Sequence, residues 1–143
     1  HIYYYLGKLL ESEGRDASKA YNEAAVYKAA VSELSLFRAL ALRKLHNFAE
    51  AKAALDEMES VADNFIKNCD MRTYYGVGSP SPMPFELDIV KNNLTDGYVL
   101  KAYALLGTGK FNEADEYIEK ARKIKQCDFR IYAYDNIKDS IKF

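Results

Sequence analysis

Apolar residues recur every three or four positions along most of the chain, which is the period of an α-helix with one buried face. The clearest stripes are Phe48, Ala51, Leu55, Met58, Ala62 and Phe65, and then Ala114, Ile118, Ala121 and Ile124. Shorter stripes lie within 3–10 and 36–45, and the Ala-rich segment from Ala17 to Val31 has high helix propensity throughout. No stretch alternates with a period of two between turn residues. The pattern therefore predicts an all-α protein.

The helical runs are separated by short interruptions at Gly14, at His46-Asn47 and at 107–109. Interruptions of this length are typical of antiparallel helix hairpins. We predict hairpins over about 2–31, 33–67 and 86–125, followed by a terminal capping helix over about 129–141, all within one domain spanning 1–143.

The segment at about 70–85 breaks this pattern, because Thr73 to Phe85 contains all three prolines and two glycines. Proline fixes φ and lacks a backbone donor, so we predict a non-helical insertion between the second and third hairpins. Its apolar residues include Tyr74 and Tyr75. The insertion is expected either to fold back onto the hairpins or to form an exposed contact patch.

The hairpins share a register. The third contains Tyr98, Ala102, Leu105, Gly109, Phe111, Ala114, Ile118 and Ala121. This spacing resembles the tetratricopeptide repeat, in which small residues stand where the two helices approach closely. The second hairpin matches the repeat at Ala39, Leu42, Phe48, Ala51 and Leu55. It departs from the repeat at Ser35, His46 and Met58. The first hairpin matches at Tyr3, Gly7, Leu10, Gly14 and Ala20. The resemblance implies a tetratricopeptide-like α-solenoid.

A second resemblance covers 74–121 and rests on an aromatic pair, Val77, Pro80, Phe85 and Asp88 ahead of a final repeat. This run is similar to the C-terminal repeat segment of large bacterial proteins whose N-terminal β-rich domain is thought to be carbohydrate-related. The resemblance, together with a start inside a helical pattern and without Met, leads us to expect a fragment of a longer protein.

Composition and charge narrow the functions further. With 20 basic and 21 acidic residues, the net charge of −1 gives no electrostatic reason to expect nucleic acid or an anionic membrane surface. No apolar run reaches the roughly 18 residues of a membrane span. Cys69 and Cys127 form no CxxC motif and suit reduced thiols in a cytoplasmic protein. Two histidines cannot assemble a His-based metal site or a catalytic triad, so we expect no metal, cofactor or enzymatic activity.

Tetratricopeptide arrays bind an extended peptide or a partner helix on the concave surface made by the first helix of each hairpin. The partner-binding residues expected from the register and from the insertion are Tyr4, Lys8, Leu40, Arg43, Lys44, Val99, Tyr103, Tyr74 and Tyr75. The charged set with which some family members grip a peptide carboxylate is expected to be absent, because Tyr4 and Val99 stand at such positions. Tyr4 and Tyr103 could instead pack on the neighbouring hairpin.

The resulting hypothesis is a non-catalytic interaction or scaffolding module. Its partner would be a protein, a peptide or another domain of the same chain. The alternative is an accessory domain of a carbohydrate-active bacterial protein that serves positioning or dimerisation, with a homodimer as one form.

Overall fold

The computed structural model describes residues 1–26, 30–71 and 88–141. These residues form seven α-helices and no strand, which confirms the all-α prediction for this part of the chain. The helices are α1 (Ile2–Ser12), α2 (Ser18–Val26), α3 (Ser35–Lys44), α4 (Phe48–Lys67), α5 (Ile89–Thr108), α6 (Phe111–Ile124) and α7 (Phe129–Ser140). The predicted insertion, including Tyr74 and Tyr75, lies almost wholly outside the described residues.

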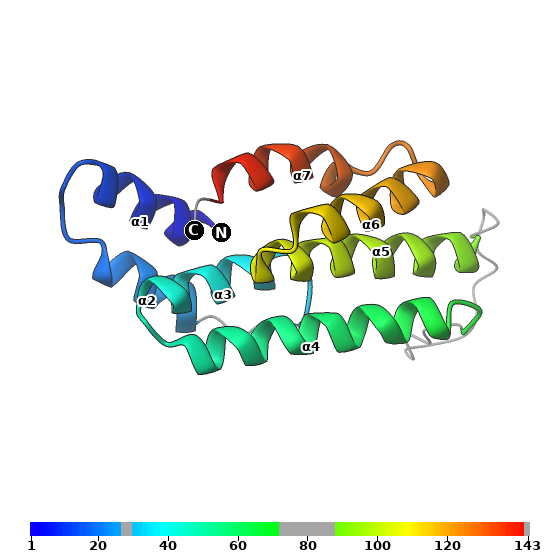
Figure 1. Ribbon diagram of the computed structural model, residues 1–143, viewed down its shortest axis with the longest axis horizontal. Coiled ribbons are helices and arrows are strands. Elements are labelled where there is room, and N and C mark those ends of the chain that lie inside the picture. Colours follow the sequence, from blue (N-terminus) through cyan, green and yellow to red (C-terminus); the bar gives the residue numbers. More distant parts are fainter. Residues whose placement is uncertain (27–29, 72–87, 142–143) are drawn as a thin grey trace, which may run out of the picture.

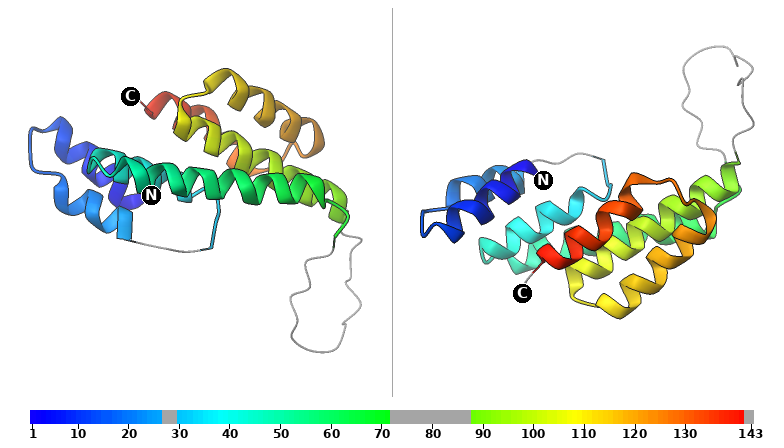
Figure 2. Two further views of the ribbon diagram at one scale, coloured as in Figure 1. Left: turned by 60° about the horizontal axis from the view of Figure 1, so that its bottom comes forward. Right: turned by 90° about the horizontal axis from the view of Figure 1, so that it is seen from above.

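Each helix packs against the next one in the sequence, and the odd-numbered helices also contact one another in the order α1, α3, α5, α7 (Figure 1). Helix α4 lies along α5, and α6 lies along the other side of α5 (Figures 1 and 2). Helix α3 is the centre of the first half. Its buried residues point in every direction around the helix axis and are Leu36, Phe37, Ala39, Leu40, Ala41 and Leu42.

Three turns between neighbouring helices have the same backbone geometry. Gly14, His46 and Gly109 each have a positive φ, of 70°, 60° and 81°. At each turn the next residue donates its amide to a carbonyl five positions earlier, over 2.9 Å at Arg15, 2.9 Å at Asn47 and 3.0 Å at Lys110. A left-handed residue with this bond is the Schellman ending of a helix. The chain therefore reverses by one mechanism at all three places.

Replacing His46 with Gly is expected to stabilise the protein by about 1 kcal/mol, because Gly adopts a left-handed backbone without the steric penalty of a Cβ atom. The reverse change, Gly109→His, is expected to destabilise by a similar amount. Urea unfolding followed by circular dichroism measures both. A destabilised His46→Gly variant would show that the contact of the His46 ring with Phe48, at 5.9 Å between centroids, matters more than the backbone.

The second helix is shorter than the Ala-rich pattern predicts. Helix α2 ends at Val26, and residues 30–34 form bends and turns, so the prediction of helix up to Val31 is wrong at its end. In this region, side chains form hydrogen bonds with backbone groups that a continuing helix would bond to other backbone groups. The Arg38 guanidinium donates to the Ala25 carbonyl at 2.9 Å, and Ser32 and Ser35 bond to nearby amides. Serine hydroxyls compete with helical hydrogen bonds in this way.

Within the described part of the chain, none of the helices is both long and apolar enough to cross a membrane.

Candidate functional site

The apolar residues expected to line a concave binding surface are buried in the core. Tyr4, Leu40 and Val99 are all buried, and Tyr103 is only 1% exposed. The Tyr103 hydroxyl donates to the Arg130 carbonyl at 2.8 Å, and its ring lies edge-on to Tyr134, with the centroids 6.0 Å apart. Helix α7 thus covers the surface of α5 that the sequence pattern left open. These four side chains present no surface to an external partner here.

The expected cationic residues connect helices to one another. The Lys8 ammonium donates to the Ser140 carbonyl and joins α1 to the end of α7. The Arg43 guanidinium donates to the Gly107 carbonyl at 2.6 Å, which joins α3 to α5. Lys44 pairs with Glu11 at 2.8 Å, which joins α3 to α1. All three bonds are made within the chain, so these cations stabilise the helix arrangement.

Burial keeps the core tyrosines neutral. It raises the pKa of Tyr4 to about 12 and raises the pKa of Tyr21, Tyr103 and Tyr134 further. The Tyr21 hydroxyl donates to Glu11 and the Tyr134 hydroxyl donates to Asp115, each at 2.9 Å. A phenol whose proton is held this firmly is a structural donor. None of the four therefore has the pKa of a general base at neutral pH.

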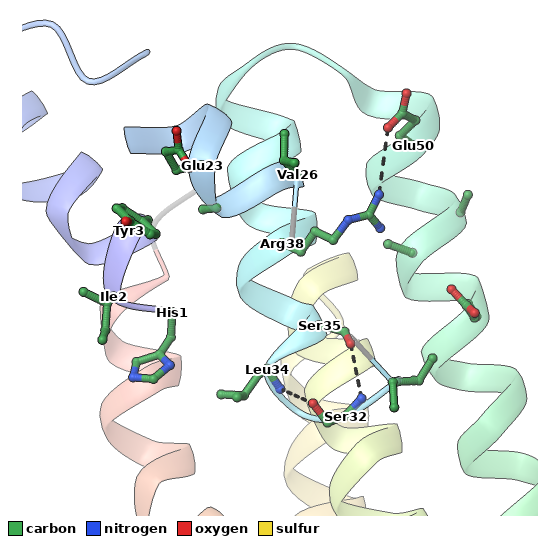
Figure 3. A pocket seen from close by; sticks show the side chains of 16 residues that line it. His1, Ile2, Tyr3, Glu23, Val26, Ser32, Leu34, Ser35, Arg38 and Glu50 are labelled. Atoms are coloured by element: carbon green, nitrogen blue, oxygen red, sulfur yellow. Dashed lines mark hydrogen bonds and ion pairs between the residues drawn. The ribbon is translucent and has the colours of Figure 1, made fainter. Parts of the chain in front are cut away.

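A groove of about 840 Å³ opens between α1, α2, α3 and α4 (Figure 3). Its walls carry four large apolar side chains that are exposed to solvent: Ile2, Tyr3, Val26 and Leu34. Two of these are among the most exposed apolar residues of the described chain, with Ile2 at 71% and Val26 at 78%. Ala53 and Ala54 of α4 also line the groove. This set brings together residues that are far apart in the sequence.

The charged groups of the groove are mostly acidic. Its acidic side chains are Glu23, Glu50 and Glu57, and its cationic groups are the Arg38 guanidinium and the amino group of His1. The Arg38 guanidinium is already engaged, because it donates to the Ala25 carbonyl and lies 4.0 Å from the Glu50 carboxylate (Figure 3). The groove is therefore apolar with a net negative charge. Such a site suits a ligand that combines apolar groups with a positive charge.

The groove could not be found by the sequence reasoning, which followed the opposite face of α1. That face carries Tyr4 and Lys8, whereas the groove is lined by Ile2 and Tyr3. One signal in the sequence indicates the groove. The first turn of α1 has an isoleucine and three tyrosines in a row, and four consecutive large residues cannot all lie on one buried face of a helix. The other contributors, Ser32 to Ser35, belong to the turn that the pattern assigned partly to helix.

A smaller hollow of about 350 Å³ lies beside the turn between α6 and α7. Its charged groups include Asp128 and Arg130, which bind each other at 2.7 Å. Across the described residues, no group of three or more His, Cys, Asp or Glu side chains is placed to hold a metal ion. Every buried side-chain nitrogen or oxygen there has a hydrogen-bond partner.

Comparison of the chain with models of protein families, with curated proteins and with solved structures found no match.

Proposed function

We propose that the chain is a non-catalytic protein-interaction module of tetratricopeptide-like architecture. Its partner binds in the groove between α1, α2, α3 and α4. This moves the binding surface away from the residues that the sequence register indicated, because those residues hold the helices together.

The tetratricopeptide-like part of the proposal is supported by equivalent small residues around the three turns. Buried Gly7, Ala39 and Ala102 each stand seven positions before the left-handed residue of their turn. At Gly7 a Cβ atom would lie 2.5 Å from the ring of Tyr21, so α1 and α2 touch where the side chain is missing. Buried Ala51 and Ala114 stand five positions after the turn. The small residue before the turn is present in all three hairpins and the small residue after it in two, which supports related hairpins.

We infer the binding function from the concentration of exposed apolar side chains in one groove. Single exposed apolar residues are common on protein surfaces, whereas a gathered set rimmed by charge marks an interaction site. Ile2 and Tyr3 come from α1, Val26 from the end of α2 and Leu34 from the turn before α3. Three separate parts of the chain meet there.

The charge of the groove defines the chemistry of the partner. Glu23 and Glu57 are both exposed, and neither has an ion-pair partner among the described residues. A peptide segment with two or more large apolar side chains and a neighbouring Lys or Arg would bury the apolar walls and pair with these carboxylates. We propose a basic, apolar peptide segment of another protein as the occupant.

Selection from a random peptide library displayed on phage, with the full chain as bait, tests the proposal. The enriched peptides are expected to combine large apolar residues with Lys or Arg. A synthetic copy of the consensus peptide is then expected to bind the Ala53→Phe variant at least tenfold more weakly than the wild type, because the new ring fills the groove. The Glu57→Lys variant is expected to weaken it several-fold by repelling the positive charge.

Ala49→Phe is the matched control, because Ala49 is exposed on the same helix but does not line the groove. This variant is expected to bind the consensus peptide like the wild type. If the selection enriches no consensus, or if the consensus peptide binds Ala53→Phe as tightly as the wild type, the groove is not the partner site.

Self-association is a second candidate function, favoured by the exposed face of α1. Ile2, Leu6 and Leu9 are exposed, and their spacing of four and three places them on one side of the helix. This candidate corresponds to an accessory dimerisation domain of a carbohydrate-active protein. Analytical ultracentrifugation of the same preparations separates the two: a dimer that Leu6→Asp dissociates supports self-association, and a monomer that binds the consensus peptide supports the groove.

A further inference from the structure

We propose that the face of α5 and α6 covered by α7 is a binding site for amphipathic helices, and that α7 is the helix with which the chain fills this site itself. A helix of another protein with the same pattern would bind after α7 leaves. The site is separate from the groove between α1 and α4. Helix α7 lies at the outside of the helical array and packs on α5 and α6 (Figure 2).

The apolar part of the contact is a single stripe of α7. Ile131 and Tyr134 are buried and stand three positions apart on one face of the helix, and Ile141, the C-cap residue after the helix, is buried as well. The opposite face carries Tyr132, which is 68% exposed. The covered surface therefore contacts only one face of the helix. This is how a groove recognises an amphipathic helix.

Two carboxylates flank the apolar stripe. Near the start of α7 the Arg130 guanidinium donates to Asp96 of α5 at 2.6 Å. In the last turn of α7, the Lys138 ammonium donates to Asp115 of α6 at 2.7 and 2.8 Å. The Tyr134 hydroxyl donates to the same carboxylate. The two cations stand eight positions apart, about 12 Å along a helix. These two pairs place the acidic group on the site and the basic group on the helix, whereas Asp135 of α7 lies 3.6 Å from Arg122 of α6 with the charges reversed. The occupant is therefore defined by two cations, at the positions of Arg130 and Lys138, beside the apolar stripe.

For another helix to bind, α7 must leave as a unit. Its N-cap is internal, because Asp128 accepts the Arg130 amide at 3.0 Å, so the cap travels with the helix. Residues 125–128 precede it without helical structure. The flanking pairs are partly open to water, with the Asp96 and Asp115 side chains 41% and 42% exposed. The contacts to release also include the Tyr103 hydroxyl bond to the Arg130 carbonyl, the ring contact of Tyr103 with Tyr134, and, at the far end, the Lys8 bond to the Ser140 carbonyl.

Because α7 is covalently linked to the rest of the chain, a partner helix must bind the site more tightly than α7 does in order to displace it. A tethered helix competes at an effective concentration of about millimolar, so a free helix of equal affinity displaces little of it. A change that weakens α7 is expected to open the site. Binding at this site is thereby regulated from within the chain.

A labelled synthetic peptide of residues 127–141 serves as the probe, and the full chain is used throughout. The variant Tyr134→Ala/Lys138→Ala weakens α7 and leaves α5 and α6 unaltered. The peptide is expected to bind this variant at least tenfold more tightly than the wild type in fluorescence anisotropy. Adding Asp115→Ala to the variant is expected to weaken the peptide about tenfold, because the peptide loses its Lys138 and Tyr134 partner.

Two controls test the pattern itself. A designed peptide that keeps Asp128, Arg130, Ile131, Tyr134, Lys138 and Ile141 but carries Ala or Gln elsewhere is expected to bind within about threefold of the natural peptide. The chain variant Tyr132→Ala, on the exposed face of α7, is expected to behave like the wild type. Ala53→Phe, in the groove between α1 and α4, is expected to leave peptide binding unchanged, so failure at one site is distinguishable from failure at the other.

Hydrogen–deuterium exchange of the wild type shows whether α7 leaves without global unfolding. The amides of α7 are expected to exchange faster than those of α3 and α5. Exchange of α7 only together with α3 and α5 would overturn the proposal. So would equal peptide affinity with and without Asp115→Ala. A concentration-dependent dimer formed by the wild type through exchange of α7 would also overturn it, since the occupant would then be a second copy of this chain.

Discussion

Replacing Tyr103 with Ala is expected to lower the free energy of unfolding by about 3–5 kcal/mol, the range for truncating a large buried aromatic side chain. Tyr103 is 1% exposed and lies between α5 and α7. The substitution removes its ring contact with Tyr134 and leaves the Arg130 carbonyl without the hydroxyl that bonds it at 2.8 Å. Urea unfolding followed by circular dichroism measures the change.

The matched control is Tyr132→Ala, which removes the same side chain from the exposed face of α7 and is expected to change stability by less than about 0.5 kcal/mol. Tyr103→Phe separates the hydroxyl from the ring and is expected to lose about 1–2 kcal/mol. The experiment decides between the two roles that the sequence allows for Tyr103. A partner-binding side chain in an open groove would be replaced by Ala with little loss of stability, and that result would show that α7 does not cover α5.

The all-helical class could be predicted from the sequence because amphipathic periodicity is a local property. The turns at Gly14, His46 and Gly109 were also visible, since each combines a helix-breaking residue or pair with short spacing. The left-handed backbone at His46 follows the register of the other two turns. The residues at each turn were therefore sufficient to predict where the helices end.

The position of the proposed binding groove could not be predicted, because it depends on which helix covers which face. Leu40, Val99 and Tyr103 occupy the outward positions of their helices in the repeat register, and α7 and the neighbouring helices bury them. One signal was available: the run from Leu36 to Leu42 has a single charged residue, and a helix that is apolar all round is buried. The groove needs the fold, since α1, α2, α3 and α4 all contribute to it.

Replacing Asp128 with Ala is expected to lower the free energy of unfolding by about 2–3 kcal/mol at neutral pH. Asp128 is 6% exposed and accepts three bonds from Arg130: from its amide and its Nε at 3.0 Å, and from its Nη2 at 2.7 Å. Alanine removes the N-cap of α7 and one of the two carboxylates that hold a half-buried guanidinium. Asp128→Asn, which retains a capping oxygen, is expected to lose less than Ala.

The loss is expected to depend on pH. The hydrogen bond from Arg130 holds the pKa of Asp128 below its ordinary value. The stabilisation is therefore fully present above the ordinary Asp pKa of about 3.9 and declines as the pH falls through the lower pKa of the folded state. Urea unfolding at pH 7, 5 and 3 is expected to show the same difference between wild type and Asp128→Asn at the first two values and a smaller one at the third.

In the Asp128→Asn variant, the free energy of unfolding still depends on pH because of other carboxylates. Bonds from Lys44 and Tyr21 lower the pKa of Glu11; burial raises the pKa of Asp115, but bonds from Lys138 and Tyr134 outweigh it and give a net lowering. Both carboxylates join separate helices, α1 to α3 and α6 to α7. Acid is thus expected to loosen the two ends of the array in every variant, while only the contribution of Asp128 disappears with Asp128→Asn. A difference between wild type and Asp128→Asn that stays constant down to pH 3 would show that the charge of Asp128 does not stabilise the start of α7.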